Sequence, residues 1–569
     1  MGKIAKREDS KMKPLPLDYN PNSNQSNKAS STNIDTFNSS SSNSVKIPTY
    51  AWKMLAILSC IATMVMYAET MLIPAIPDLI RDFHVSYSMS SWILTSYLIA
   101  GAVMTPIAGK LSDIYGRKKI LLIIMVIYAL GVSMAGFASD IYFMIFARAV
   151  QGIGMSMFPI AFGMIRDQFP REKISIGQGV ITSMFASGAV LGLTVGGIIV
   201  QDYGWHNTFF TIIPIAIALL LIIWRFIHVV DIKDDDQSQD QSRIVESDNI
   251  GSDNIGKTRN GNDKTTFAKV SNQIDIKGAI ALAVTVASFL LALTLLETSG
   301  SNMEAASFAN GNDNHPSDAN SLSNVLPFLI IGVISFVLFV IIERREKYPL
   351  VDFKLMLHKS ILPASLIIML VGFSMFMVFQ TIPILVRNPE PLGFGEDAIS
   401  AGKVQLPFAI VLLIFGPTSG FIVSKLGSLK PIIFGTIITT AGFIGLLMFH
   451  STELLVSLNL GILSTGLSLT SVGAMNVIIL STPRQFSGIS LGMSSLMRIV
   501  GASIGPALAG MYMQTNQTSL NIDGIMNYFP SSMSFDLIFL SAVIVSIISI
   551  ALAIILRQRV TKMAIPNLS

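Results

Sequence analysis

The sequence has few charged residues. Only 13% of its 569 residues are Asp, Glu, Lys or Arg, whereas a soluble chain carries about a quarter. Hydrophobic residues make up 51%, and apolar runs of roughly 20 residues, long enough to cross a ~30 Å hydrocarbon layer, recur along the chain. We therefore exclude a soluble protein and predict a multi-pass membrane protein.

Cysteine and catalytic motifs are also scarce. The single cysteine, Cys60, lies inside an apolar run, which excludes a disulfide framework and a thiol-rich metal site. We find no nucleotide-binding P-loop and no nucleophile motif, so we predict neither an enzyme nor a primary pump. The net charge is +4, and the excess Lys and Arg residues lie in particular loops. We predict no nucleic-acid partner, no metal and no cofactor.

Apolar length predicts fourteen transmembrane helices. They lie near 51–76, 91–110, 118–138, 141–165, 173–200, 207–229, 276–297, 323–343, 360–386, 398–424, 430–449, 453–480, 486–514 and 535–557. The fold class that this predicts is an all-α membrane protein with two six-helix bundles and two extra central helices.

The predicted domains follow from these helices and from two polar stretches. They are a disordered cytoplasmic tail (1–50), an N-terminal six-helix bundle (51–230), a disordered cytoplasmic linker (231–273), two additional transmembrane helices (274–345) and a C-terminal six-helix bundle (346–560). Lys and Arg concentrate in the loops on one side, which predicts that both termini are cytoplasmic. The predicted location is the plasma membrane.

The two bundles contain matching sequence features. Pro106, Gly109 and Gly116 recur 311 residues later as Pro417, Gly420 and Gly427. The stripe Gly188, Gly192, Gly196 and Gly197 recurs 313 residues later as Gly501, Gly505, Ala509 and Gly510. Small residues every four positions let helix backbones approach closely. Repetition at a nearly constant offset predicts a transporter built from parallel repeats.

Two ionisable residues lie inside predicted helices of the first bundle. Glu69 and Arg148 have opposite charge and similar depth below the outer surface. Because a charge inside a membrane is costly, residues that carry one there usually have a functional role. We interpret them as a proton or substrate site; the alternative is a buried ion pair that only fixes packing. The repeat places Gln380 opposite Glu69, so the architecture itself does not need the charge.

A third intramembrane charge, Arg498, lies near mid-membrane in the predicted helix 486–514. The glycine stripes align it with Phe185 in the first bundle. Two interpretations stay open: contact with substrate, or packing against a polar partner such as Gln405 or Asn476.

The stretch Gly109–Lys119, GKLSDIYGRKK, is the charged hairpin between two spans. The charges serve either as a topology anchor, by the preference for cations on the cytoplasmic side, or as part of a moving joint. The matching stretch of the second bundle has Ser424 in place of Asp113 and Ser428 in place of Arg117.

These motifs resemble the major facilitator superfamily, and within it the fourteen-helix drug:proton antiporter branch. Motif A of that family is matched by Gly109, Asp113, Gly116, Arg117, Lys118 and Lys119. RAVQGIG, with Arg148, Gln151 and Gly152, resembles motif B, which the family links to proton coupling. GAVLGLTVGG resembles the antiporter motif C, with Leu193 where the family has Pro; Pro506 stands at the matching place of the second bundle.

The resemblance implies alternating access, in which two halves rock around a central cavity. It implies that Asp113 meets the positive end of helix 486–514 and that Arg117 pairs with Asp167, which together latch the outward-open state. The predicted function is proton-coupled export of amphipathic or cationic small molecules. The alternatives are a proton-coupled or facilitated importer of a nutrient or metabolite, and a non-transporting receptor or scaffold. The expected partners are a small-molecule substrate, protons and the lipid bilayer, with the chain as a monomer.

Overall fold

Long apolar helices make up nearly all of the computed structural model, which describes residues 46–85, 87–227, 275, 277–292, 295, 319–346, 349, 353–483, 486–522 and 525–564. Thirteen described helices are long and apolar enough to cross a membrane, and a shorter apolar helix, Lys277–Ala292, lies where another is predicted. The predicted all-α membrane fold is confirmed. The predicted tail, except for its last five residues, and the predicted linker lie outside the described residues.

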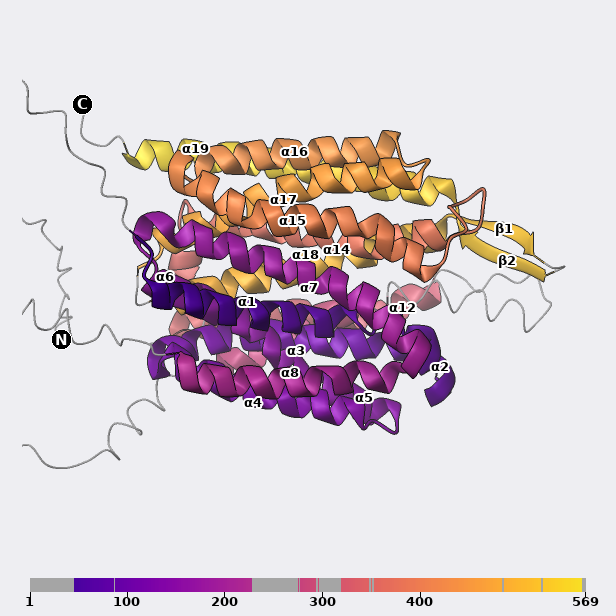
Figure 1. Cartoon of the computed structure of the whole chain (residues 1–569), viewed down its shortest axis with the longest axis horizontal. Helices are drawn as coiled ribbons and strands as arrows, with labels where there is room; N and C mark the ends of the chain where they lie inside the picture. The colour runs from indigo at the N-terminus through magenta and orange to yellow at the C-terminus, as the bar shows by residue number, and fades with distance from the viewer. Residues whose placement is uncertain are drawn as a thin grey trace, which may run out of the picture. The chain divides into compact units, whose positions relative to one another are not determined.

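The first half contains six described segments long and apolar enough to span a membrane, arranged as in Figure 1. They are α1 (Thr49–Thr70), α3 (Tyr87–Tyr115), α4 (Arg117–Gly136), α5 with η1 and α6 (Ile141–Gly152, Ile153–Ser156, Met157–Gln168), α7 (Ile174–Tyr203) and α8 (Trp205–Phe226). A short 3-10 turn, η2 (Arg171–Lys173), precedes α7. Helix α1 ends at Thr70, six residues before the predicted end, because a turn containing Pro74 leads into a short outer helix, α2 (Ile76–Phe83).

The second half repeats this arrangement after the inserted pair. Its elements are α14 (Ile361–Arg387), α15 (Ala398–Leu426), α16 (Leu429–Met448), α17 (Glu453–Ser481), α18 (Ser487–Thr515) and α19 (Ser532–Ala564), preceded by α12 (Ala319–Arg345) and a one-turn helix, α13 (Phe353–Met356). Gly116 lies in the turn between α3 and α4, and Gly427 lies in the corresponding turn between α15 and α16. Their φ angles are positive, 93° and 74°, a conformation that glycine adopts without strain.

Helix starts carry the expected capping residues. The Asp140 side chain accepts a hydrogen bond from the Phe143 N–H at 2.9 Å, and Asp397 accepts one from the Ser400 N–H at 2.7 Å. These bonds satisfy donors that the first helical turn leaves unpaired. The donation from Ser400 holds the pKa of the exposed Asp397 carboxyl below its usual range.

One element breaks the all-helical pattern. Strands β1 (Gln517–Ile522) and β2 (Ile525–Pro530) form an antiparallel hairpin between α18 and α19. The sequence of this region contains Asp-Gly, a dipeptide typical of two-residue hairpin loops. Asn388 Nδ2 donates to the Pro530 carbonyl at 2.9 Å, which ties the end of the hairpin to the end of α14.

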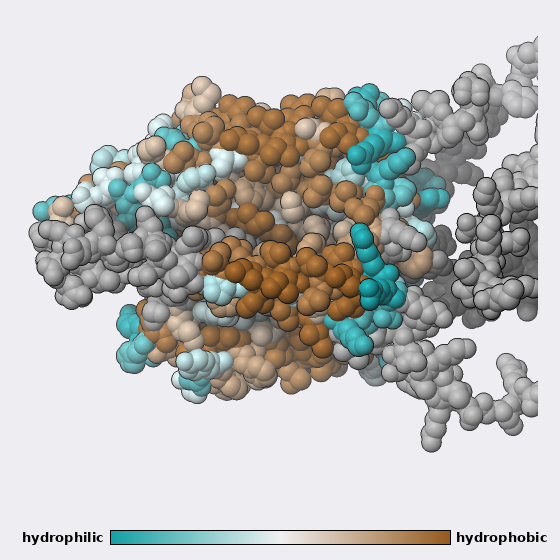
Figure 2. Space-filling view, turned by 180° about the vertical axis from the view of Figure 1, so that it is seen from behind, coloured by the Kyte–Doolittle hydropathy of each residue, from teal (hydrophilic) through white to brown (hydrophobic). Residues whose placement is uncertain are grey.

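The two halves meet mainly along two helix pairs, α3 with α18 and α7 with α15, with further contacts between α7 and α17 and between α6 and α18. Within each half, a matching pair packs tightly: α1 with α7, and α14 with α18. On the face seen in Figure 2, the middle of the bundle is broadly hydrophobic and hydrophilic side chains gather at both ends. This pattern is that of a bilayer-embedded belt.

Candidate functional site

Arg148 is fully buried at the centre of the first half. Its Nη1 donates to the Ala68 carbonyl at 3.1 Å and to Gln151 Oε1 at 2.7 Å, and its Nε donates to the Ile93 carbonyl at 3.3 Å. Its guanidinium lies 4.4 Å from the centre of the Tyr97 ring, a favourable cation–π geometry. Arg148 thus holds α1, α3 and α5 together through their backbones.

Glu69 directly follows Ala68, whose carbonyl binds Arg148, and no ion pair joins the two side chains in the described part of the chain. Its carboxylate is 6% exposed, and its Oε2 finds no hydrogen-bond partner within the described part of the chain. The guanidinium groups of Arg498 and Arg148 both attract it electrostatically, and Arg498 does so more strongly. The structure therefore brings α1 and α5 into contact through the Ala68 backbone and leaves the Glu69 carboxylate attracted by one guanidinium group from each half.

Arg498 approaches Glu69 from α18. Its guanidinium lies 4.2 Å from the Phe185 ring centre and 5.7 Å from that of Phe158, while its Nη1 has no hydrogen-bond partner among the described residues. Phe185 and Arg498 are equivalent positions of the two repeats. Parallel repeats are related by an axis along the membrane normal, so equivalent residues that touch lie near this axis. Arg498 therefore marks the centre of the molecule.

Of the two polar residues considered as partners of Arg498, Asn476 bonds elsewhere and Gln405 is buried. Asn476 donates to Ser428 Oγ at 2.8 Å, so it belongs to the α16–α17 contact. Gln405 is buried on α15 with its Nε2 lacking a hydrogen-bond partner in the described residues. Gln380, the counterpart of Glu69, is half-buried on α14.

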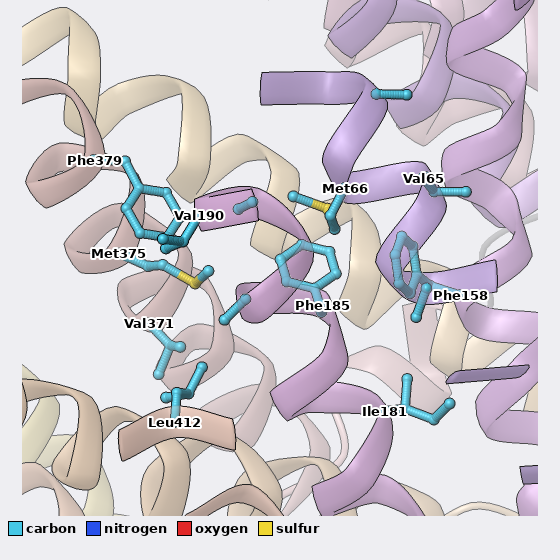
Figure 3. Close-up of a cluster of buried hydrophobic side chains, with 14 of the residues drawn as sticks. Val65, Met66, Phe158, Ile181, Phe185, Val190, Val371, Met375, Phe379 and Leu412 are labelled. Atoms are coloured by element: carbon cyan, nitrogen blue, oxygen red, sulfur yellow. The ribbon is translucent and has the colours of Figure 1, made fainter. Parts of the chain in front are cut away.

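Apolar side chains from both halves pack around Phe185, the residue whose ring contacts Arg498. Figure 3 shows Val65, Met66 and Phe158 of the first half near Phe185, with second-half side chains across from them. The second-half side chains are Val371, Met375, Phe379 and Leu412. Flexible methionines and aromatic rings adapt to ligands of varied shape. A few charges within an apolar wall are typical of a small-molecule site.

The charged hairpin closes one end of the interface between the halves. Asp113 Oδ2 accepts a hydrogen bond of 2.7 Å from the Gly488 N–H in the first turn of α18, where free N–H groups and the helix dipole favour an anion. A side-chain Cβ at Gly109 would overlap the Gly488 carbonyl, and one at Gly488 would overlap that of Gly109. The backbones of α3 and α18 are therefore in direct contact.

Arg117 joins three elements at the same end. Its Nε donates to Asp167 on α6 at 2.5 Å, its Nη2 donates to Ser487 Oγ at 2.7 Å, and its Nη2 lies 3.4 Å from Asp113. A Cβ at Gly163 would overlap its guanidinium. The sequence analysis anticipated the pairing with Asp167, but Ser487 was missed because no sequence pattern marks a lone serine as an acceptor.

Further hydrogen bonds close this end. Arg166 Nη2 donates to the Thr482 carbonyl at 2.6 Å, and Ser175 Oγ donates to the Gly420 carbonyl at 2.7 Å. Of the hairpin's lysines, Lys118 donates to the Trp224 carbonyl at 3.1 Å within the first half, and Lys119 is exposed. Among the described residues, Lys118 and Lys119 thus show no bond across the halves, whereas Asp113 and Arg117 do.

The glycine stripes explain the tight pairs within each half. Cβ atoms at Gly188 and Gly192 would overlap the backbone of α1, and one at Gly196 would overlap Met71 just after α1; Thr70 Oγ1 donates to the Ala189 carbonyl at 2.7 Å. Gly197 differs, with its nearest neighbour, Pro74, at 3.7 Å.

In the second half, Gly501 and Gly505 approach the backbone of α14 in the same way. Pro506 lies inside α18.

Comparisons with known proteins agree with this architecture. The profile of the Major Facilitator Superfamily matches residues 58–506. Multidrug transporter protein MdtP of Bacillus subtilis is 24% identical over 80% of this chain and 74% of its own length. Multidrug resistance protein 3 of the same organism is 27% identical over 79% and 76%. The tetracenomycin C resistance and export protein of Streptomyces glaucescens is 24% identical over 81% and 76%.

A solved structure supports the same fold. The crystal structure of the human organic anion transporter MFSD10 superposes with a TM-score of 0.55 at 13% identity, covering 89% of this chain and all of that one. With the helix order, the repeated glycine contacts and the profile match all in agreement, this chain belongs to the Major Facilitator Superfamily and is a membrane transporter.

Proposed function

We propose that this transporter exports small amphipathic compounds, cationic ones included, in exchange for protons across the plasma membrane, with both termini cytoplasmic. The observation that carries the proposal is the Glu69 carboxylate, buried at the junction of the two halves with Oε2 unpaired among the described residues. A buried carboxylate gains from taking up a proton. The relatives named as a multidrug transporter and as a tetracenomycin C resistance and export protein support the direction.

The proposed cycle uses the residues at the closed end as a latch. The bundles 51–230 and 346–560 rock against each other, and the contacts of Asp113 and Arg117 with the first turn of α18 hold the outward-facing state. Protonation of Glu69 weakens its attraction to Arg498, which lies in the other half. A ligand shifts a conformational equilibrium only through its different affinity for the two states, and this charge pair supplies such a difference.

The test is transport in proteoliposomes with an imposed pH gradient and a panel of lipophilic cations and uncharged dyes. We expect proton release when substrate is added, and its loss in Glu69→Gln. Glu172→Gln, which changes an exposed carboxylate in η2, is the matched control and keeps full transport. Undiminished coupling in Glu69→Gln, or full transport without a gradient, contradicts the proposal.

One observation favours the importer as a second candidate. Among the described residues, two guanidinium groups, those of Arg148 and Arg498, act on the Glu69 carboxylate at the centre. An organic anion on Arg498 would favour protonation of Glu69, so anion and proton would bind together and move in one direction. The same assay decides, because co-transport makes substrate and protons enter together, whereas exchange makes them move oppositely.

A further inference from the structure

The inserted helix pair forms a groove on the outer surface of the transporter. Helix Lys277–Ala292 and α12 touch where Ser335 Oγ donates to the Ala281 carbonyl at 2.9 Å and where Phe289 approaches Gly332. Beside these contacts lies an open hollow of about 530 Å³. Its walls are apolar except at Lys277 and Ser335, and the lining includes Ile280, Val284, Ile331, Ile334, Leu338 and Ile342.

The length of the groove matches one leaflet of a bilayer. Along α12 it runs from Ile331 to Ile342, roughly 16 Å at 1.5 Å per residue, and half of a ~30 Å hydrocarbon layer is about 15 Å. The pair also faces outward, since only 22% of the most apolar stretch of α12 is buried, less than in the other spans described. An acyl chain from one leaflet therefore fits the groove in length and polarity.

At one end of the helix pair, the described cations are exposed and two of the acids are buried. Gly278 lies against Glu343, so the start of one helix meets the end of the other, and this end carries the exposed cations Lys277, Arg344 and Arg345. The exposed Glu346 is the acid among them. The outward charge at this end is therefore mainly positive.

The other two acids of this end turn inward. Asp275 and Glu343 are buried, 5% and 3% exposed. Both attract the buried ammonium group of Lys110 on α3, Glu343 most strongly. Lys110 Nζ also donates to the Pro349 carbonyl at 3.1 Å. The inward acids hold the pair against α3, which leaves the cations free to meet a ligand outside.

We propose that this groove binds an anionic phospholipid, with one acyl chain between the two helices and the phosphate on Lys277, Arg344 and Arg345. The leaflet is the one on the side of the charged hairpin, since Lys110 belongs to that hairpin. Cations at a membrane surface attract anionic lipids by ~1 kcal/mol each, about fivefold in affinity.

Native mass spectrometry of the full chain, titrated with phosphatidylglycerol and phosphatidylcholine of the same acyl chains, tests the proposal. We expect phosphatidylglycerol to bind at least tenfold more tightly. The triple variant Lys277→Gln, Arg344→Gln and Arg345→Gln loses this preference, at about fivefold per cation. A control triple variant, made of exposed cations on other helices, keeps it: Lys425→Gln, Lys430→Gln and Arg557→Gln.

A second variant tests the groove apart from the charge. Val284→Trp fills the hollow from an exposed position and leaves every cation in place, so phosphatidylglycerol binding falls although the monomer elutes and unfolds as before. Equal binding of the two lipids, or equal losses in both triple variants, overturns the proposal. Unchanged binding in Val284→Trp also overturns it, because the lipid would then contact only the charged rim. A dimer that forms in place of lipid binding would assign the groove to a second copy of the chain.

Discussion

The contact between Gly109 and Gly488 predicts that one added methyl group opens the closed end of the transporter. In Gly109→Ala, the new Cβ would meet the Gly488 carbonyl oxygen and carbon, which are backbone atoms of the other half. Backbone cannot rotate away as a side chain can. The overlap is therefore relieved only if α3 and α18 separate, which is the motion that opens this end.

The magnitude follows from the size of the overlap. Forcing one extra methyl group into a packed contact costs about 1–3 kcal/mol. Because the cost applies to the closed state alone, the ratio of open to closed molecules rises by roughly 5- to 150-fold. A matched control is Gly435→Ala, whose Cβ would lie 2.7 Å from the Thr470 backbone nitrogen, within the second half. This variant loses stability but keeps the same distribution of states.

The assay is the distance between spin labels at Arg171 and Lys425, both exposed, on η2 and α15, which pack together. The native Cys60 is replaced by Ser in this background. We expect a second, longer distance in Gly109→Ala and none in Gly435→Ala. A distribution identical to that of the unsubstituted protein would refute the reasoning, since the α3–α18 contact would then not belong to the moving interface.

Three other predictions use the same structure. Arg148→Ala lowers the free energy of unfolding in detergent by ~3 kcal/mol, because two buried carbonyls lose their donor at about 1–3 kcal/mol each. Arg498→Ala impairs transport but loses less stability in thermal unfolding. Equal losses of stability in the two variants would contradict this. Gly192→Ala destabilises by about 1–3 kcal/mol in thermal unfolding, while Gly197→Ala, with its nearest neighbour at 3.7 Å, is neutral; the reverse order would disprove the packing argument. Asp113→Ala destabilises the closed state relative to the open state by about 2 kcal/mol, because a charged hydrogen bond is lost. Asp113→Asn has a smaller effect because it keeps an acceptor, and the spin-label distances check this order.

The sequence predicts the helices well because membrane crossing leaves few options. Apolar length and terminal charges locate each span to within a few residues, and the structure follows the prediction from α3 to α18. The prediction fails at the end of α1, where Pro74 permits a turn inside an apolar run. It also passes over the β-hairpin, since a search for long apolar runs does not register alternating polar strands.

The candidate site could be predicted only in part. Charge inside a span identifies Glu69, Arg148 and Arg498 from the sequence, because such residues are rare in membranes. The partners of these three side chains cannot be identified from the sequence. Arg148 bonds to backbone carbonyls of α1 and α3, and every residue carries such an acceptor, so only tertiary placement decides which ones are used. Ser487 and the Lys110–Glu343 attraction were missed for the same reason.

The contact between Phe185 and Arg498 bears on how a duplicated chain acquires a central charge. Had the two copies stayed identical, any residue at this place would face itself. Two arginines would repel each other in a region with little water to screen them, and two phenylalanines would leave no charge for a substrate. A single cation at the centre thus requires the copies to differ there. The aromatic ring opposite it is a neutral surface on which a cation is stable.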